Sequence, residues 1–307
     1  MNKNIITKIV LFATLALTIV GCEPYEEYVT DYKYSAVYFG TQKPLRTLVA
    51  RESSDKLNFK LGIVLAGLRE NKTDQWATFE IAPDLLTTVT GASAFTLMPA
   101  DWYSFSIAEN KITIPKGKFM GDFTISIDKA KMSADPLALT KKYAIPVRIL
   151  DSSADTVLSS KNYTIVVVKY ISENSGTYYA RGIQSEYNTT TLDTIAGTTK
   201  KYIIADWSKN KTRVFSTLTA MECDMVGMGF DATEKLKVGF GVNKAITLST
   251  SAANATVIVA DLGSSYDPTT KEFHLVYTYL KSAKTYKVDE YLKLRNDPEN
   301  DLRFEEW

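Results

Sequence analysis

The chain has 307 residues, of which 45% are hydrophobic and 11% aromatic, so it is long enough to bury a substantial core. It carries 36 Lys and Arg residues against 35 Asp and Glu residues, a formal net charge of +1. No basic excess is available to displace counterions from phosphates, so the composition argues against nucleic acid as a partner.

The first residues have the order of parts of a secretory signal peptide. Lys3 and Lys8 precede an uncharged apolar run that extends from Ile9 to Gly21. A polar segment follows directly after Cys22. A helix that crosses a membrane needs about 20 apolar residues, so this run is too short to span. We therefore expect residues 1–21 to be a cleaved signal peptide.

The residues IVGC at positions 19–22 resemble the bacterial lipobox, in which a small residue precedes a cysteine that is lipidated and exposed by cleavage. The resemblance implies that Cys22 carries palmitate or similar chains, and several chains attach a protein stably. The alternative is an ordinary signal peptide with an incidental cysteine.

The tether at residues 22–33 carries Glu23, Glu26 and Glu27 close behind Cys22 and resembles the surface-export signal of Bacteroidetes outer-membrane lipoproteins. A solvated acidic segment without such a role is the alternative. We expect an outer-membrane protein that is lipid-anchored and faces the cell exterior.

The only other cysteine is Cys223, so no intrachain disulfide can form once Cys22 is lipidated. A thiol nucleophile would need a base, and the only histidine is His274. His274 alternates with apolar residues in FHLVYTY and is predicted to lie in a strand. We favour a buried core cysteine over a Cys-His pair.

Residues 34–172 are predicted to form an antiparallel, Ig-like β-sandwich of about seven strands. Apolar residues recur at every second position in 59–65, 123–127 and 143–149, which indicates strands with one buried face. The β-branched run at 163–170 predicts a strand buried on both faces. Pro146 predicts an edge strand or a bulge, and helical periodicity is confined to about residues 84–89.

The polar segment SENSG at 172–176 is the best linker candidate, and we place a domain boundary at 173. Beyond it, short strand-like runs without helices predict an antiparallel, lipocalin-like barrel over 173–307. Asp267-Pro268 predicts a turn between two of these strands. The expected fold class is all-β, a sandwich followed by a barrel.

Four stretches, two in each half of the chain, resemble known families. LMPADWYSFSIAENKITIPKGKFMGDFTISID (97–128) and YAIPVRILDSS (143–153) resemble the N-terminal domain of Bacteroidetes surface lipoproteins, the domain-of-unknown-function 1735 type. That domain also precedes the catalytic barrel of some endo-β-N-acetylglucosaminidases. YDPTTKEFHLVYTY (266–279) and DLRFEEW (301–307) resemble a lipocalin-like partner domain, the domain-of-unknown-function 4361 type.

These resemblances imply a cell-surface protein of a polysaccharide-utilisation system that binds or presents glycans without catalysis. The implied partners are an oligosaccharide or polysaccharide, the outer membrane through the lipid, and an outer-membrane glycan transporter complex. The alternative is a structural or adhesive subunit that contacts proteins of an outer-membrane complex. A glycosidase is the least favoured interpretation, because no motif nominates a pair of carboxylates.

No cofactor or metal ion is predicted. The acidic run from Asp297 to Asp301 spaces oxygen atoms somewhat as a calcium loop does, but Leu302 replaces the required glycine, so a solvated turn is favoured. The tripeptides beginning at Asp155 and Asp193 resemble the sites at which Bacteroidetes attach O-glycans to exported proteins. Whether those sites are used stays open.

Candidate ligand contacts are aromatic, because Trp and Tyr rings pack against the C–H faces of sugars and carry a polar tip. Trp76 and Trp207 each border a polar stretch and are the tryptophans most expected to be exposed. Tyr178 and Tyr179 lie on opposite faces of one predicted strand, so at most one faces a barrel lumen, whether open or filled.

The remaining tryptophans have a structural interpretation. Trp102 and Tyr103 are predicted to pack the sandwich, since aromatic residues favour strands. Trp307 is expected either to plug the barrel or to be frayed.

Overall fold

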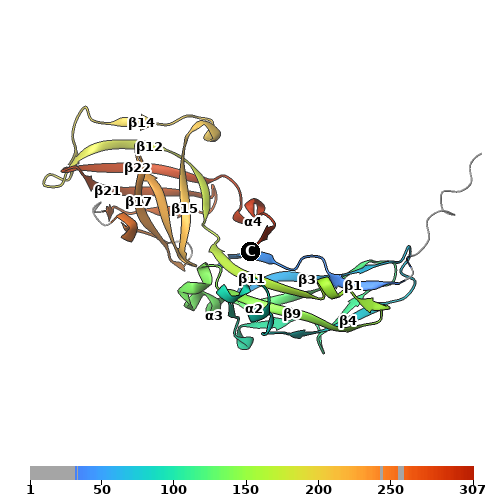
Figure 1. Cartoon of the computed structure of the whole chain (residues 1–307). Coiled ribbons are helices and arrows are strands. Elements are labelled where there is room, and N and C mark those ends of the chain that lie inside the picture. Colours follow the sequence, from blue (N-terminus) through green and yellow to red (C-terminus); the bar gives the residue numbers. More distant parts are fainter. Residues whose placement is uncertain (1–31, 33, 243–244, 255–258) are drawn as a thin grey trace, which may run out of the picture.

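The computed structural model describes residues 32, 34–242, 245–254 and 259–307. The predicted signal peptide, Cys22 and nearly all of the acidic tether lie outside these residues. The described chain is almost entirely β-structure, with a two-sheet sandwich followed by a barrel-like sheet (Figure 1), which confirms the expected fold class. Within the described residues no helix is long and apolar enough to cross a membrane.

The sandwich consists of a five-stranded and a seven-stranded sheet. The first has the order β10 (Thr156–Val157), β1 (Ala36–Phe39), β3 (Lys56–Ala66), β8 (Met120–Asp128) and β6 (Tyr103–Phe105). The second has the order β23 (Glu305–Glu306), β2 (Pro44–Ala50), β11 (Tyr163–Ser172), β9 (Tyr143–Ser152), β4 (Gln75–Ile81) and β7 (Lys111–Ile114), with β5 (Thr96–Leu97) beside β9.

Three pairings in the sandwich are parallel, namely β1 with β10, β2 with β11 and β5 with β9. The sheets are therefore mixed at these places, where we expected antiparallel strands throughout. Alternation of apolar residues predicts which face of a strand is buried, but it carries no information on the direction of the neighbouring strand.

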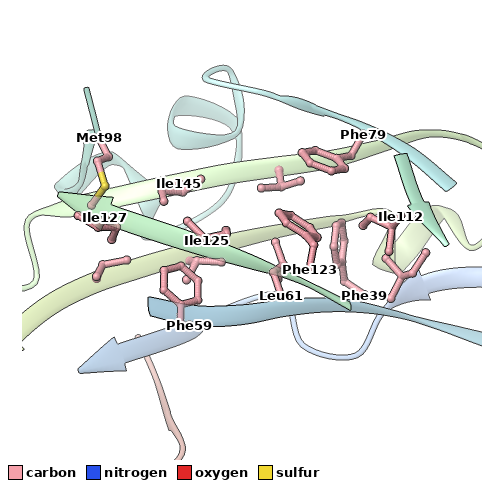
Figure 2. Close-up of a cluster of buried hydrophobic side chains, with 14 of the residues drawn as sticks. Phe39, Phe59, Leu61, Phe79, Met98, Ile112, Phe123, Ile125, Ile127 and Ile145 are labelled. Carbon is pink, nitrogen blue, oxygen red and sulfur yellow. The ribbon is translucent and has the colours of Figure 1, made fainter. Parts of the chain in front are cut away.

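Alternate residues of the two sheets meet in the sandwich core, as the period of two predicts. Figure 2 shows Phe59, Leu61 and Phe123 facing Phe79 and Ile145 of the other sheet. The rings of Phe79 and Phe123 stack with their centroids 5.1 Å apart. Trp102 and Tyr103 pack against this core, which confirms their structural interpretation.

Strand β11 is buried on both faces, as its β-branched run predicts. Val166 and Val168 belong to the core between the sheets, whereas Ile165 and Val167 face a second apolar cluster on the outside. Helix α2 (Leu85–Thr88), which lies in the segment predicted to be helical, covers that outer face. The second burial therefore comes from a helix packed on the sheet.

The expectation for Pro146 is wrong, because β9 lies between β11 and β4 and is not an edge strand. The bulge in the β4–β9 ladder is displaced from the proline and lies near Phe79. The carbonyl of Pro146 accepts a hydrogen bond from Ala82 N–H, just beyond the last residue of β4, Ile81. The proline is tolerated because its missing N–H falls where the neighbouring ladder ends.

The polar segment at 172–176 connects β11 to the first strand of the barrel, and several of its residues are buried. Ser172 N–H donates to Thr217 Oγ1 at 3.0 Å, and Ser172 Oγ donates to the carbonyl of Ala220 at 3.0 Å. Ser175 Oγ donates to the carbonyl of Phe215 at 3.1 Å. The polar residues that predict a linker instead form hydrogen bonds that attach this connection to the barrel.

The barrel-like sheet has eleven strands, and the main path runs β18-β17-β16-β15-β12-β22-β21-β19. Its longer strands are β12 (Gly176–Asn188), β15 (Lys211–Thr219), β16 (Glu222–Met228), β17 (Asp231–Phe240), β21 (Glu272–Lys281) and β22 (Lys284–Leu294). The shorter ones are β13 (Asp193–Thr194), β14 (Lys200–Tyr202), β18 (Ile246–Thr250), β19 (Val259–Asp261) and β20 (Ser265–Asp267). Strand β16 is absent from the predicted runs, because acidic residues interrupt its apolar pattern.

Side chains bring the two end strands of the barrel together. Asp261 Oδ2 accepts the N–H of Leu248 at 3.1 Å, and Thr250 Oγ1 accepts the N–H of Val259 at 3.0 Å. These bonds join β18 to β19, between which the described residues form no backbone ladder, so the sheet curves almost into a closed barrel.

The barrel interior contains packed apolar side chains and a buried polar cluster. Arg213 Nη2 lies 2.8 Å from Glu290 Oε2, and both side chains are buried. The hydroxyls of Tyr202 and Tyr277 donate to Glu290 at 3.0 and 2.8 Å. Burial alone would lower the pKa of Arg213, but attraction to Glu290 outweighs burial and raises it. The Arg213 guanidinium therefore stays charged inside the barrel.

The C-terminal segment returns to the sandwich. Helix α4 (Pro298–Asp301) follows the barrel, and β23 then pairs with β2, with Glu306 opposite Pro44. Trp307 Nε1 donates to the carbonyl of Ile165 at 2.7 Å, and its ring meets that of Phe95 edge-on. Trp307 is thus neither a barrel plug nor frayed, since it covers the outer face of the sandwich.

Replacing Glu290 should destabilise the barrel. Glu290→Gln keeps the shape of the side chain but leaves the Arg213 charge buried without a counter-charge, so we expect unfolding to become easier by about 3 kcal/mol in urea titrations. The exposed Asp193→Asn change removes one negative charge without this effect and is the control. Equal midpoints for the two variants would show that the buried pair does not stabilise the fold.

Asp231 should make stability depend on pH. Burial alone would raise its pKa, but the ammonium of Lys281 and the backbone N–H groups of Thr233 and Glu234 lower the pKa to about 2. The unfolded carboxyl titrates near its usual value of 3.8, so the stabilisation is complete above that pH and is lost as the pH falls towards 2. Asp231→Asn should cost about 2 kcal/mol at pH 6 and much less at pH 2 by chemical denaturation. A pH-independent difference would contradict this linkage.

Candidate functional site

A cavity of about 550 Å³, which we call the junction pocket, lies where the barrel meets the sandwich. The sandwich contributes Arg51, and the connecting turn contributes Glu173 and Asn174. The rest of the wall comes from the barrel and from the segment that leaves it, namely Tyr178, Tyr266, Phe273, residues 269–271 and residues 293–297. Pockets at domain interfaces are common ligand sites, so we take this one as the candidate.

One side of the pocket is braced by Arg51. Its guanidinium donates to both carboxylate oxygens of Asp297, at 3.1 and 2.8 Å, and to Glu299 at 2.7 Å. The hydrogen bond from Arg51 holds the pKa of Asp297 below its usual range. Asp297 also accepts the backbone N–H of Glu299 and caps α4. The acidic run predicted as a solvated turn is therefore an ion-paired contact between the two domains.

The floor of the pocket is aromatic. The rings of Tyr266 and Phe273 have centroids 4.9 Å apart, and Tyr178 packs 5.7 Å from Phe273. Tyr178 is buried and donates its hydroxyl to the carbonyl of Asn174 at 2.9 Å, whereas Tyr266 is only partly buried. Tyr266 therefore offers the most accessible ring of this floor.

The rim of the pocket is polar. The turn after β20 carries Thr269 and Thr270, whose N–H groups donate to Asp267 Oδ1, and then Lys271 with a φ of 57°. This is the turn that Asp267-Pro268 predicts. The end of β22 contributes further polar and charged groups across residues 293–297. An aromatic floor beneath a hydrogen-bonding rim matches the two kinds of surface that a sugar presents.

The structure places Tyr178 and Tyr179 on opposite faces of β12, as predicted. Tyr178 belongs to the barrel core and contributes to the wall of the junction pocket. Tyr179 points to the outer face and lies opposite Lys293 of β22. The two tyrosines thus cannot contact one ligand through the same face of the strand.

Trp207 lies outside the junction pocket, in a short turn packed beside β12. The guanidinium of Arg181 is 4.0 Å from the centre of its ring, and Lys293 Nζ is 5.8 Å away. A sugar could stack on the face that Arg181 covers only by displacing it. Lys293 also lines the pocket, so Trp207 flanks the pocket without belonging to it.

Trp76 lies on β4 of the sandwich and does not contribute to the junction pocket. Its ring is partly buried, and Lys111 Nζ lies 4.7 Å from the ring centre. Of the four predicted contacts, the structure therefore brings Tyr178 to the pocket and Tyr179 and Trp207 to the neighbouring outer face, while Trp76 is separate.

Cys223 and His274 do not form a pair. Cys223 is buried in the barrel core, and burial raises the pKa of its thiol to about 12. His274 lies in β21, as predicted, where its Nε2 is 2.8 Å from Asp289 and its ring stacks on Tyr291. The preference for a core cysteine is confirmed, because Cys223 lies inside the barrel core and His274 is paired with Asp289.

Two other chemical possibilities are a metal ion and attached glycans. In the part of the chain that the structure describes, no three His, Cys, Asp or Glu side chains are grouped so that they could hold a metal ion. Thr156 and Thr194, in the predicted O-glycan sites, are both exposed. Attachment of glycans there stays a prediction.

Sequence comparison supports the expected type of N-terminal domain. A family model described as an N-terminal domain matches residues 32–156, which is most of the sandwich. The type of the second domain and the lipid anchor stay predictions. No curated protein matches the chain.

Several similar solved structures come from Bacteroides. A Bacteroides ovatus protein of unknown function is 18% identical, with a TM-score of 0.68 over 88% of this chain and 96% of that chain. This likeness shows a common two-domain fold. A multidomain Bacteroides ovatus protein that includes domain of unknown function 1735 is 16% identical, with a TM-score of 0.42 over 90% of this chain and 100% of that chain.

Proposed function

We propose that this protein binds glycans without catalysis and that the junction pocket is its binding site. The observation that carries the proposal is the combination of an aromatic floor, with Tyr266 over Phe273, and a polar rim in one cavity between two domains. Aromatic rings bury the C–H faces of a sugar, and the rim can bond its hydroxyls.

The brace around Arg51 supports binding by a preformed site. Arg51 joins the sandwich to Asp297 and Glu299 across more than 240 positions of sequence. The pairing of β23 with β2 and the contact of Trp307 with Ile165 add a second attachment between the same parts of the chain. A site that is already ordered loses less conformational entropy when it binds a ligand.

The charge state of Asp297 argues against one catalytic role in the pocket, that of the general acid of a glycosidase. A glycosidase needs one carboxyl with a raised pKa, which protonates the leaving oxygen, and a second carboxylate nearby. Glu173 and Asp297 are the carboxylates of the pocket lining, and the hydrogen bond from Arg51 lowers the pKa of Asp297. Asp297 is thus poorly suited to act as the acid.

The proposal includes attachment at the cell surface through Cys22. Such an anchor would keep a glycan receptor beside a transporter complex of the outer membrane. The support for this part is the order of charged, apolar and polar residues around Cys22.

Glycan binding can be measured with the chain from residue 23 onward on a panel that includes host N-glycans, mucin O-glycans and plant polysaccharides. For a ligand found there, Tyr266→Ala should weaken binding at least about tenfold, because it removes the accessible ring of the floor. Trp76→Ala and Trp207→Ala are matched aromatic truncations outside the pocket and should retain binding.

Loss of binding in Trp76→Ala with full binding by Tyr266→Ala would move the site to the sandwich. No binding to any glycan, together with copurification of an envelope protein, would favour the structural or adhesive alternative.

The anchor can be tested separately. Cys22→Ala should release the protein from the outer membrane or retain it in the wrong compartment, because the acyl chains have no other attachment point. Fractionation and surface labelling measure this, with Cys223→Ala as the control for loss of a cysteine. Unchanged surface retention of the Cys22 variant would refute lipid anchoring.

A further inference from the structure

The junction pocket is richer in positive charge than the chain as a whole. Its lining contains four basic residues, Arg51, Lys271, Lys293 and Arg295, against the two acidic residues Glu173 and Asp297. The whole chain has 36 basic and 35 acidic residues. The excess in the pocket is therefore local, and it lies beside the aromatic floor.

Arg51 lines the pocket, but its positive charge is already neutralised by neighbouring carboxylates. Two carboxylates, Asp297 and Glu299, already bind its guanidinium at hydrogen-bonding distance. The cations that remain on the rim are Lys271, Lys293 and Arg295. All three come from the barrel or from the segment that follows it.

These three cations have weak carboxylate partners or none. Lys293 Nζ is 3.7 Å from Glu272, and Arg295 Nη2 is 3.9 Å from Asp301, both longer than a normal hydrogen bond. Neither of those carboxylates lines the pocket. No carboxylate of the described residues forms an ion pair with Lys271. Because ion pairs of this length contribute little when the cation is exposed, as Lys293 and Arg295 are, an anion in the pocket can replace them at small cost.

We infer that the ligand of the junction pocket is an acidic oligosaccharide, in which a sugar on the aromatic floor carries a carboxylate or sulfate group towards the rim. This inference rests on the proposed glycan-binding function and names the class of glycan. Arg295 can bind such a group through two parallel N–H bonds, and the lysines add compact positive charges. Binding should weaken as salt screens these charges.

The test compares matched ligands by calorimetry on the chain from residue 23 onward. One arm uses a trigalacturonate and its carboxyl-reduced neutral counterpart, and a second arm uses a keratan sulfate oligosaccharide, which contains no uronate, and its desulfated neutral form. We expect an acidic ligand to bind at least tenfold more tightly than its neutral partner at 20 mM salt, a preference largely lost at 500 mM. The arm that shows the preference identifies carboxylate or sulfate as the group recognised.

Variants locate the charge effect. Lys293→Gln combined with Arg295→Gln should reduce the acidic preference at least fivefold while thermal unfolding stays within a few degrees of the parent. Lys161→Gln is the control, because it removes a positive charge from the sandwich, where its ammonium lies 5.4 Å from the ring of Tyr38. An equal loss in both variants would assign the preference to net charge and overturn the assignment to the pocket.

The two proposals fail in different ways. Equal binding of acidic and neutral ligands would overturn the acidic preference and leave glycan binding intact. Binding confined to neutral sugars on the wider panel would do the same. No binding of any sugar would overturn the function on which the inference rests.

Discussion

The contact between Arg51 and the acidic segment after the barrel is the interaction on which the candidate site depends. A guanidinium from the sandwich binds Asp297 bidentately and Glu299 through a third bond, so one side chain joins two domains that are distant in sequence. A planar bidentate pair is directional as well as attractive, so it constrains orientation. The junction pocket exists because the domains meet in this orientation.

Two further contacts also hold the sandwich and the barrel together. The connecting turn is bonded to the barrel through Ser172 and Ser175, so it is not a free hinge. At the other end, β23 extends the sandwich sheet and Trp307 covers its outer face. The pocket thus lies between three attachments of different kinds, a buried turn, an ion-paired helix cap and a strand pairing.

The interior of the barrel differs from the core of the sandwich in polarity. The sandwich core is apolar and its strands alternate regularly, whereas the barrel interior contains the pair of Arg213 and Glu290, which two tyrosine hydroxyls complete. Such a cluster is stable only when its hydrogen bonds are nearly all made. This requirement explains why side chains fill the barrel interior around Arg213 and Glu290.

The sequence by itself determined the class of the fold, because period two in apolar residues reports strands and one buried face wherever a strand lies half in the core. It also determined the doubly buried β11 and the turn at Asp267. It did not reveal β16, whose acidic residues are buried or paired, or the place of Pro146 inside a sheet. These depend on neighbours that local pattern does not encode.

For the site, sequence reasoning found Tyr178 and the turn near Asp267, but it had no means to find Arg51 or Tyr266. Only the tertiary structure decided the pocket, because its walls come from strands, turns and a helix cap that are separated by up to 246 positions along the chain. The aromatic candidates chosen for their polar neighbours lie on other surfaces. Periodicity reports the environment of each residue, whereas a binding site is defined by which residues meet across the fold.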